Sequence, residues 1–152
     1  MLEFLKLIVK DYGLFGLLVS SFMGSTIFLP FSVELTFPFL VKAGMPRLAI
    51  MFFAALGSLG GTLLNYSIGN KGMNYVLKYT KLDDVNRAKN LMDRYGWAGL
   101  FIVLAFPVPF PVDPLTLFCG AAKMEPKRFT TVVFTAKLLK YALTLGVISI
   151  IL

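Results

Sequence analysis

Residues 101–120 read FIVLAFPVPFPVDPLTLFCG, an apolar stretch that four prolines interrupt and that contains one carboxylate, Asp113. A helix ending before Pro107 has about eleven residues, or roughly 16 Å, little more than half the thickness of a bilayer's hydrocarbon core. Because proline stops a helix from continuing, we expect the chain to turn back to the side from which it came. Residues 96–120 therefore predict a re-entrant helical hairpin within a membrane.

The composition of the whole chain also requires a membrane. Of its 152 residues, 57% are hydrophobic and 15% are charged. A soluble protein of this size cannot bury so much apolar surface, so we expect the excess to face lipid. The length allows a single membrane domain over residues 1–152.

Two further stretches are free of proline and nearly free of charge. Residues 48–70 and 129–152 each form, as helices of about 23 residues, a rod of roughly 34 Å that can cross a bilayer. Residues 12–41 are broken by proline like the stretch quoted first, so we expect a second hairpin from Gly13 to Ala43, although its first arm is long enough to span. The expected breaks in the two hairpins are marked by Pro30, Pro107, Pro109 and Pro111.

The two halves of the sequence repeat each other at an offset near 80 residues. Each half is a hairpin followed by one span, and since only the span changes sides, the second half begins on the opposite face. We predict an all-α integral membrane fold of two inverted pseudo-repeats, about residues 12–70 and 95–152, joined by a polar connector at about 71–94. The matching segments are Tyr12–Leu17 with Tyr95–Leu100, Pro30–Glu34 with Pro109–Asp113, and Met45–Arg47 with Met124–Arg128.

The distribution of charge predicts the orientation. Residues 71–94 and 123–128 hold nine Lys and Arg, against four on the other side of the predicted membrane. Basic loops stay in the cytoplasm, so we expect a cytoplasmic loop at the connector and a multi-pass protein of the cell, or inner, membrane. The net charge of +7 is mixed with aspartates between apolar segments, which favours anionic lipid rather than nucleic acid as the partner.

Glu34 and Asp113 are the strongest candidates for function, because a carboxylate inside an apolar stretch costs at least a few kcal/mol. Each follows a proline break at an equivalent place in the repeat. Burial favours proton binding and release at such groups, whereas a nearby cation favours a fixed charge. The alternative is that each carboxylate only caps the helix after its hairpin turn.

Lys137 and Lys140 lie near the middle of the last predicted span, three residues apart and so on one helix face. We expect them to pair with Asp113 and Glu34 or to hold a phosphate headgroup as it crosses. The alternative is that the final helix is tilted or begins later, which would put both lysines at the membrane interface.

In the first predicted span, small residues recur every four positions at Gly57, Gly61 and Gly69, with Asn65 on the same side. This pattern predicts close packing against another helix, with Asn65 hydrogen-bonding across the contact or toward the hairpin turns. Histidine is absent, which excludes a Ser/His triad and His-rich metal sites, and the lone Cys119 predicts packing. We expect no metal and no cofactor.

The order of these features resembles the DedA family, also called the SNARE-associated or VTT-domain family, and within it the short YqaA-like branch. The resemblance covers nearly the whole chain. It depends on Leu29-Pro30-x3-Glu34, Gly57-x2-Gly60-Gly61-x3-Asn65-x3-Gly69, Arg94-Tyr95-Gly96, Pro107-x5-Asp113-x6-Gly120 and Phe134-x2-Lys137-x2-Lys140-Tyr141.

The resemblance implies two facing re-entrant hairpins and movement of phospholipids or polyprenyl phosphates between leaflets, with proton coupling. It also implies that the functional carboxylates fall on Glu34 and Asp113. The larger branch of the family has an arginine just before the proline of the second hairpin, where this chain has Ala105-Phe106-Pro107. That basic role has either moved to Lys137 or Lys140 or been lost.

We therefore expect a lipid transporter or scramblase, a flippase-like protein and not an enzyme, whose partners are a membrane lipid and protons. The alternatives are an assembly or membrane-homeostasis factor without lipid flux and, ranked lower, an intramembrane enzyme with a carboxylate dyad. A homodimer that encloses the hairpins is a further expectation, although the face from Gly57 to Gly69 serves equally within one subunit.

Overall fold

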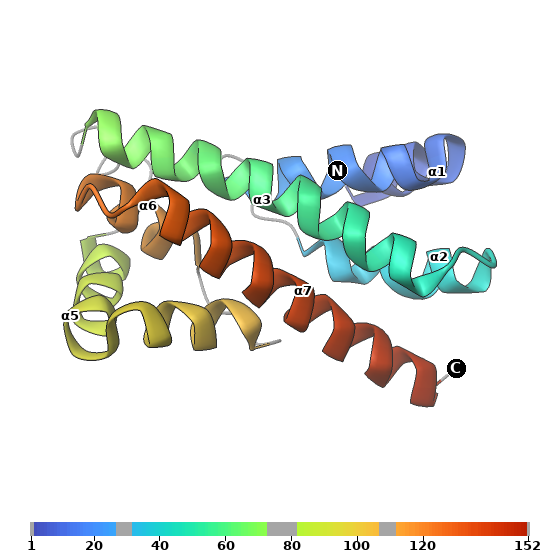
Figure 1. The fold of residues 1–152 in the computed structure, drawn as a ribbon. Coiled ribbons are helices and arrows are strands. Elements are labelled where there is room, and N and C mark those ends of the chain that lie inside the picture. The colour runs from blue at the N-terminus through green and yellow to red at the C-terminus, as the bar shows by residue number, and fades with distance from the viewer. Residues whose placement is uncertain (1, 27–31, 73–81, 107–111, 152) are drawn as a thin grey trace.

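The computed structural model describes residues 2–26, 32–72, 82–106 and 112–151, and within these ranges it leaves out the side chains of residues 2–10, 82, 84–85, 88–89, 91 and 112–114. All regular elements in the described part are helices, which confirms the all-α prediction. They are α1 (Leu2–Gly24), the 3-10 helix η1 (Val33–Thr36), α2 (Phe37–Lys42), α3 (Arg47–Lys71), α5 (Leu82–Ala105), α6 (Val112–Ala121) and α7 (Pro126–Ile151) (Figure 1).

Two helices in the described part, α3 and α7, are long and apolar enough to cross a membrane. With 25 and 26 residues they extend about 37 and 39 Å. They run in opposite directions, because Tyr66 near the end of α3 packs on Phe129 near the start of α7, with ring centroids 4.7 Å apart. The helices predicted at 48–70 and 129–152 are confirmed, each with a few more residues.

A bend at Gly13 divides α1 into two arms. We call the arm after Gly13, together with η1 and α2, the first hairpin. Gly13 bends α1 with φ 56° and ψ −126°, a conformation that essentially only glycine adopts. A Cβ added at Gly13 would lie 3.3 Å from the Cε of Met45, which follows α2. Gly13 and Met45 therefore lie close together near the start of α3, at the end of the molecule that we call the α2 end.

We call the arm of α5 that follows Gly96, together with α6, the second hairpin. Gly96 bends α5 with φ 56° and ψ −138°. The guanidinium carbon of Arg128, in the first turn of α7, lies 5.2 Å from the ring centroid of Trp97. Trp97 therefore lies beside the start of α7, at the end of the molecule that we call the α6 end, and Figure 1 shows α2 and α6 at opposite ends of α3.

Both hairpins join their spanning-length helix through the same turn. The amide of Met45 donates to the carbonyl of Leu40 at 3.2 Å, and that of Met124 donates to Cys119 at 3.1 Å. The residue before each methionine has a positive φ, 79° at Gly44 and 52° at Lys123. This is the Schellman pattern of a helix C-terminus, so the sequence repeat corresponds to a repeated local structure.

The connector predicted at about residues 71–94 contains helix, since the chain is helical from Leu82 onward. Met92 is buried while Asp83, Arg87 and Asp93 are exposed. A helix with one apolar side is stabilised by packing, and this one-sided pattern is less visible in a segment so rich in charge.

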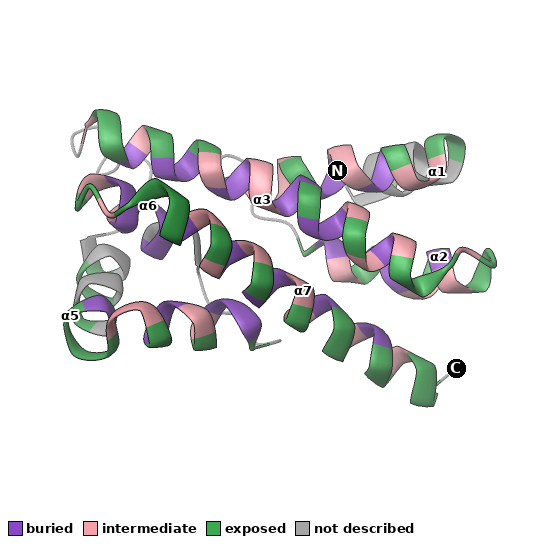
Figure 2. Ribbon diagram, viewed as in Figure 1, coloured by how far each residue is buried: buried purple, intermediate pink, exposed green. Residues whose placement is uncertain are grey.

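Two apolar cores lie at the two ends of the molecule, and each combines one hairpin with the near ends of α3 and α7 (Figure 2). The core at the α6 end includes Tyr66, Leu100, Leu104, Leu115, Cys119, Phe129 and Val133. The core at the α2 end includes Leu17, Val33, Phe37, Leu40, Ile50, Ala54, Tyr141 and Leu145.

Candidate functional site

Polar side chains gather near the middle of α3 and α7, between the two apolar cores. Most are almost fully buried, at 0% exposure for Ser21, Ser58 and Asn65. We call this set the central polar layer. It consists of Ser21, Ser25, Glu34, Ser58, Thr62, Asn65, Thr116, Lys137 and Lys140.

Lys137 is the most buried charged side chain that the described residues contain, with 6% exposure. Its ammonium donates a hydrogen bond to Ser58 Oγ, and the hydroxyls of Ser58 and Ser25 are hydrogen-bonded to each other. Ser25 lies directly after α1, in the first hairpin, whereas Ser58 belongs to α3. The lysine of α7 is therefore connected to both neighbouring elements through hydroxyl groups, which are also good ligands for an oxyanion.

Lys140 forms an ion pair with Glu34, with 2.6 Å between Nζ and Oε1 and side-chain exposures of 22% and 17%. This confirms the predicted pairing of the lysine with a hairpin carboxylate. Glu34 also lies in the first turn of η1, as the capping alternative expects, but its ion pair with Lys140 shows that it does more than cap this helix. The helix α7 does not begin late enough to put its lysines at its end, because it starts at Pro126.

Asn65 connects the two hairpins, as its position in the sequence predicts. Its Nδ2 donates to the carbonyl of Ser25 at 3.1 Å and to Thr116 Oγ1 in α6 at 3.4 Å. Ser25 belongs to the first hairpin and Thr116 to the second. One amide in the second half of α3 therefore contacts both hairpins.

Glycines allow this close approach. A Cβ would lie 2.2 Å from the Leu18 carbonyl oxygen at Gly57, and 2.0 Å from that of Leu117 at Gly69. No side chain fits at such distances, so the small-residue face predicted for α3 is confirmed. It serves packing within one subunit, against α1 at one end and α6 at the other.

Asp113 and the prolines fall outside what the structure describes. The backbone of Asp113 is in the first turn of α6, but its side chain is among those left out. Pro30, Pro107, Pro109 and Pro111 lie outside the described residues. The predicted pairing of Asp113 with a lysine therefore stays a prediction.

Sequence reasoning missed the hydroxyl groups of the layer. No motif in the sequence marks Ser25, Ser58 or Thr116 as members of a polar site. Ser25 lies directly after α1, and its amide donates to the Ser21 carbonyl at 3.1 Å, so the helical turn continues to it. The four-residue spacing therefore puts Ser21 and Ser25 on one side of the chain, and this is the signal that could have found Ser25. Ser21 Oγ donates to the Ala54 carbonyl at 2.6 Å, so this face also contacts α3.

The layer offers two ammonium groups, several hydroxyls and one carboxylate. Such donors suit an anionic oxygen such as that of a phosphate. The described residues contain no group of three or more His, Cys, Asp and Glu side chains that could hold a metal ion.

Comparison with known proteins identifies the family. Residues 25–150 match the model of the VTT domain. The chain belongs to the VTT domain family. This confirms the resemblance to the DedA family that the sequence motifs predicted. The match begins directly after α1 and includes η1, α2, α3, α5, α6 and all but the last residue of α7.

A relative of this VTT-domain protein is an uncharacterized protein of Methanocaldococcus jannaschii. It is 25% identical over 144 residues, which cover 94% of this chain and 88% of the relative. No solved structure matched the chain.

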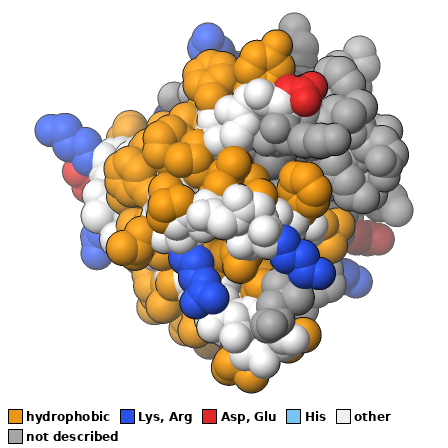
Figure 3. Space-filling model, turned by 90° about the vertical axis from the view of Figure 1, so that its right-hand side faces the viewer, with side chains coloured by type: hydrophobic (Ala, Val, Ile, Leu, Met, Phe, Trp, Pro, Cys, Tyr) orange, Lys and Arg blue, Asp and Glu red, His pale blue; other side chains and the backbone are white. Residues whose placement is uncertain are grey.

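The VTT-domain protein is a membrane protein, in a family associated with membrane transport or homeostasis. Its outward surface agrees with this. Large hydrophobic side chains are exposed along both long helices, among them Phe52 and Leu64 on α3 and Leu143 and Val147 on α7. The end view in Figure 3 shows a mainly hydrophobic surface with scattered Lys and Arg side chains.

Proposed function

We propose that this VTT-domain protein moves a lipid, either a phospholipid or a polyprenyl phosphate, between the two leaflets of the cell membrane. The observation that carries the proposal is the central polar layer, where Lys137, Lys140 and Glu34 meet between two hairpins halfway along helices of membrane-spanning length. A lysine at mid-bilayer costs roughly 2.5–3.5 kcal/mol on translocon-insertion scales, so its presence there indicates a task.

The arrangement of the hairpins supports an inverted repeat with two re-entrant hairpins. Gly13 and Met45 lie close together at the α2 end, and Trp97 lies beside the start of α7 at the α6 end. Transporters of this design place their substrate site where the two repeats meet near the bilayer midplane. The central polar layer lies at that meeting point, since Asn65 bonds to both hairpins.

The chemistry of the layer fits a phosphate-bearing headgroup. The two ammonium groups attract the phosphate, and the hydroxyls of Ser25 and Ser58 supply further hydrogen bonds. Lys140 must leave Glu34 to engage the phosphate. A proton taken up by Glu34 would release the lysine, which is how proton binding would be coupled to lipid binding. Asp113 is the equivalent carboxylate of the second hairpin in sequence.

We further propose that the α6 end faces the cytoplasm. The described part of that end has exposed Lys71, Lys123, Lys127 and Arg128, against Lys42 and Arg47 at the α2 end. Basic residues near the ends of spanning helices remain on the cytoplasmic side.

The test measures transbilayer movement of labelled phospholipid and of a polyprenyl phosphate in vesicles at two pH values. The variants are Lys137→Met, Lys140→Met, and Glu34→Gln combined with Asp113→Asn. Lys127→Gln is the matched control, since it removes an exposed lysine outside the layer. We expect wild type and Lys127→Gln to move lipid, with a rate that depends on pH, and the other folded variants to approach the protein-free rate.

Equal rates in protein-free, variant and wild-type vesicles would contradict lipid translocation. That result would favour a membrane-homeostasis or assembly factor without flux. Hydrolysis or modification of the lipid during the assay would instead indicate an intramembrane enzyme, which we propose this protein is not.

A further inference from the structure

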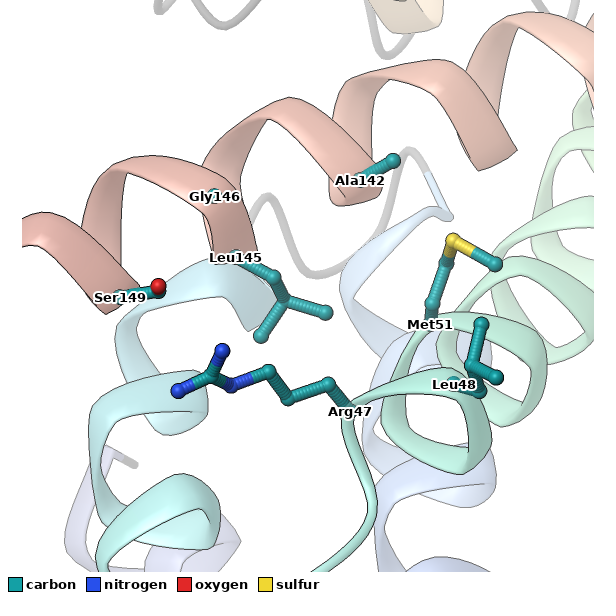
Figure 4. A pocket seen from close by; sticks show the side chains of 7 residues that line it. All are labelled: Arg47, Leu48, Met51, Ala142, Leu145, Gly146 and Ser149. Carbon is teal, nitrogen blue, oxygen red and sulfur yellow. The ribbon is translucent and has the colours of Figure 1, made fainter.

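A groove lies between the start of α3 and the end of α7, away from the central polar layer. Its volume is about 210 Å³, and it opens to the surface at the α2 end (Figure 4). The lining residues are Arg47, Leu48, Met51, Ala142, Leu145, Gly146 and Ser149.

The groove combines one cation with an apolar floor. In Figure 4 the Arg47 side chain extends from the start of α3 toward α7, and Leu145 projects from α7 to meet it. Arg47 is exposed and forms no ion pair with any residue that the structure describes. The comparable arginine of the second half, Arg128, lies over the ring of Trp97 instead. The charge of Arg47 is therefore available to a ligand.

The position of the groove indicates what would occupy it. Arg47 is the first residue of α3, and Ser149 lies in the last turn of α7, so both are at the depth of lipid headgroups. Deeper in the groove, Met51 and Leu145 present apolar surface at the depth of acyl chains. A cation above an apolar floor matches an anionic amphiphile.

We propose that this groove binds an anionic phospholipid. Its phosphate would contact Arg47 and the Ser149 hydroxyl, and the upper part of an acyl chain would lie on Leu48, Met51 and Leu145. This lipid site is separate from the central polar layer and does not depend on the proposed translocation. It requires only that the chain is embedded in a membrane.

The first test measures binding of phosphatidylglycerol and phosphatidylcholine to the purified full chain in neutral detergent, by native mass spectrometry. We expect wild type to retain phosphatidylglycerol in preference to phosphatidylcholine. Arg47→Gln should weaken phosphatidylglycerol binding about tenfold or more, because a charge-assisted contact is lost. Lys42→Gln is the matched control, since it removes an exposed cation at the same end outside the groove.

A second variant fills the groove without touching the charge. A Cβ at Gly146 meets nothing within 4 Å, so Gly146→Leu adds bulk to the groove without a clash at its root. We expect this variant to keep the wild-type melting temperature and to lose phosphatidylglycerol as Arg47→Gln does. If Arg47→Gln does not fold, phosphatidylglycerol binding by Gly146→Leu tests the proposal in its place.

Three results would overturn the proposal. The first is unchanged phosphatidylglycerol binding in the folded variants, and the second is an equal loss in Lys42→Gln. The third is displacement of the lipid by glycerol phosphate at equal concentration, which would show that the headgroup alone is bound and the apolar floor contributes nothing.

Discussion

Ser58 and Lys137 are hydrogen-bonded to each other, and each is the twelfth residue of its spanning-length helix, counted from Arg47 in α3 and from Pro126 in α7. Equivalent residues of two similar units meet in this way at a two-fold axis. The contact is thus the one expected if an inverted repeat relates the two halves. Because one member is a serine and the other a lysine, this contact carries charge from one half only, whereas the neighbouring ion pair joins Glu34 of the first half to Lys140 of the second.

The buried lysine should matter for function more than for stability. Replacing Lys137 with methionine keeps the length of the side chain, and the hydroxyls of Ser25 and Ser58 still bond to each other. We expect the variant to fold, with a fall in the free energy of unfolding of about 1–3 kcal/mol because the hydrogen bond from the buried ammonium to Ser58 is lost. Lipid movement should be lost. Thermal unfolding and the vesicle assay on one preparation measure both, and a large destabilisation would show that the lysine is structural.

The ion pair between Glu34 and Lys140 should show coupling in a double-mutant cycle. Glu34→Gln or Lys140→Met alone leaves the partner charge uncompensated and should cost about 1–3 kcal/mol, less than for a fully buried pair because both side chains are partly exposed. The double variant should be more stable than the sum of the two losses predicts, by about 0.5–2 kcal/mol. Additive losses in chemical denaturation would mean that the pair contributes nothing to stability.

Gly69 should not tolerate a side chain. Gly69→Ala brings a Cβ to 2.0 Å from the Leu117 carbonyl oxygen, so α6 must move away and about 1–3 kcal/mol of stability should be lost. Gly146→Ala is the control in the other long helix, since its Cβ meets nothing and alanine favours helix formation. Melting temperatures should fall for the first variant and hold or rise for the second. Similar melting temperatures for both would show that α6 shifts at little cost.

The bends at Gly13 and Gly96 can be tested through backbone strain alone. Gly96 has open space around its missing Cβ, yet its φ of 56° with ψ of −138° is unfavourable for any other residue. Gly96→Ala should therefore cost roughly 1–3 kcal/mol, and Gly13→Ala should cost at least as much because Met45 is also close. Wild-type stability of Gly96→Ala would indicate that α5 is not bent at this glycine in the membrane.

The sequence predicts the two helices of spanning length and the packing face of α3 because each follows from a local rule. Length and proline placement determine which stretches can cross, and glycines every fourth residue determine where helices approach. Lys140 could be matched to a hairpin carboxylate since a charge at that depth needs a partner.

The hydroxyl network could not be predicted in the same way. A serine in an apolar helix commonly bonds to its own backbone, as Ser67 does to the carbonyl of Leu63 at 2.9 Å. Whether Ser25 and Ser58 bond to each other instead depends on how α1 and α3 are rotated in the fold. That rotation is set by packing between residues distant in sequence, for which the sequence has no local pattern.

The residues that make up the two apolar cores determine when each core can form during synthesis. The core at the α2 end contains the first hairpin and the start of α3, but it also needs Tyr141 and Leu145 from the last helix. A ribosome adding 5–20 residues per second takes roughly 4–15 s to make the chain between α3 and Leu145. During that interval the apolar surface of the first half that Tyr141 and Leu145 will cover is still exposed, so membrane chaperones and proteases can bind it before the last helix does.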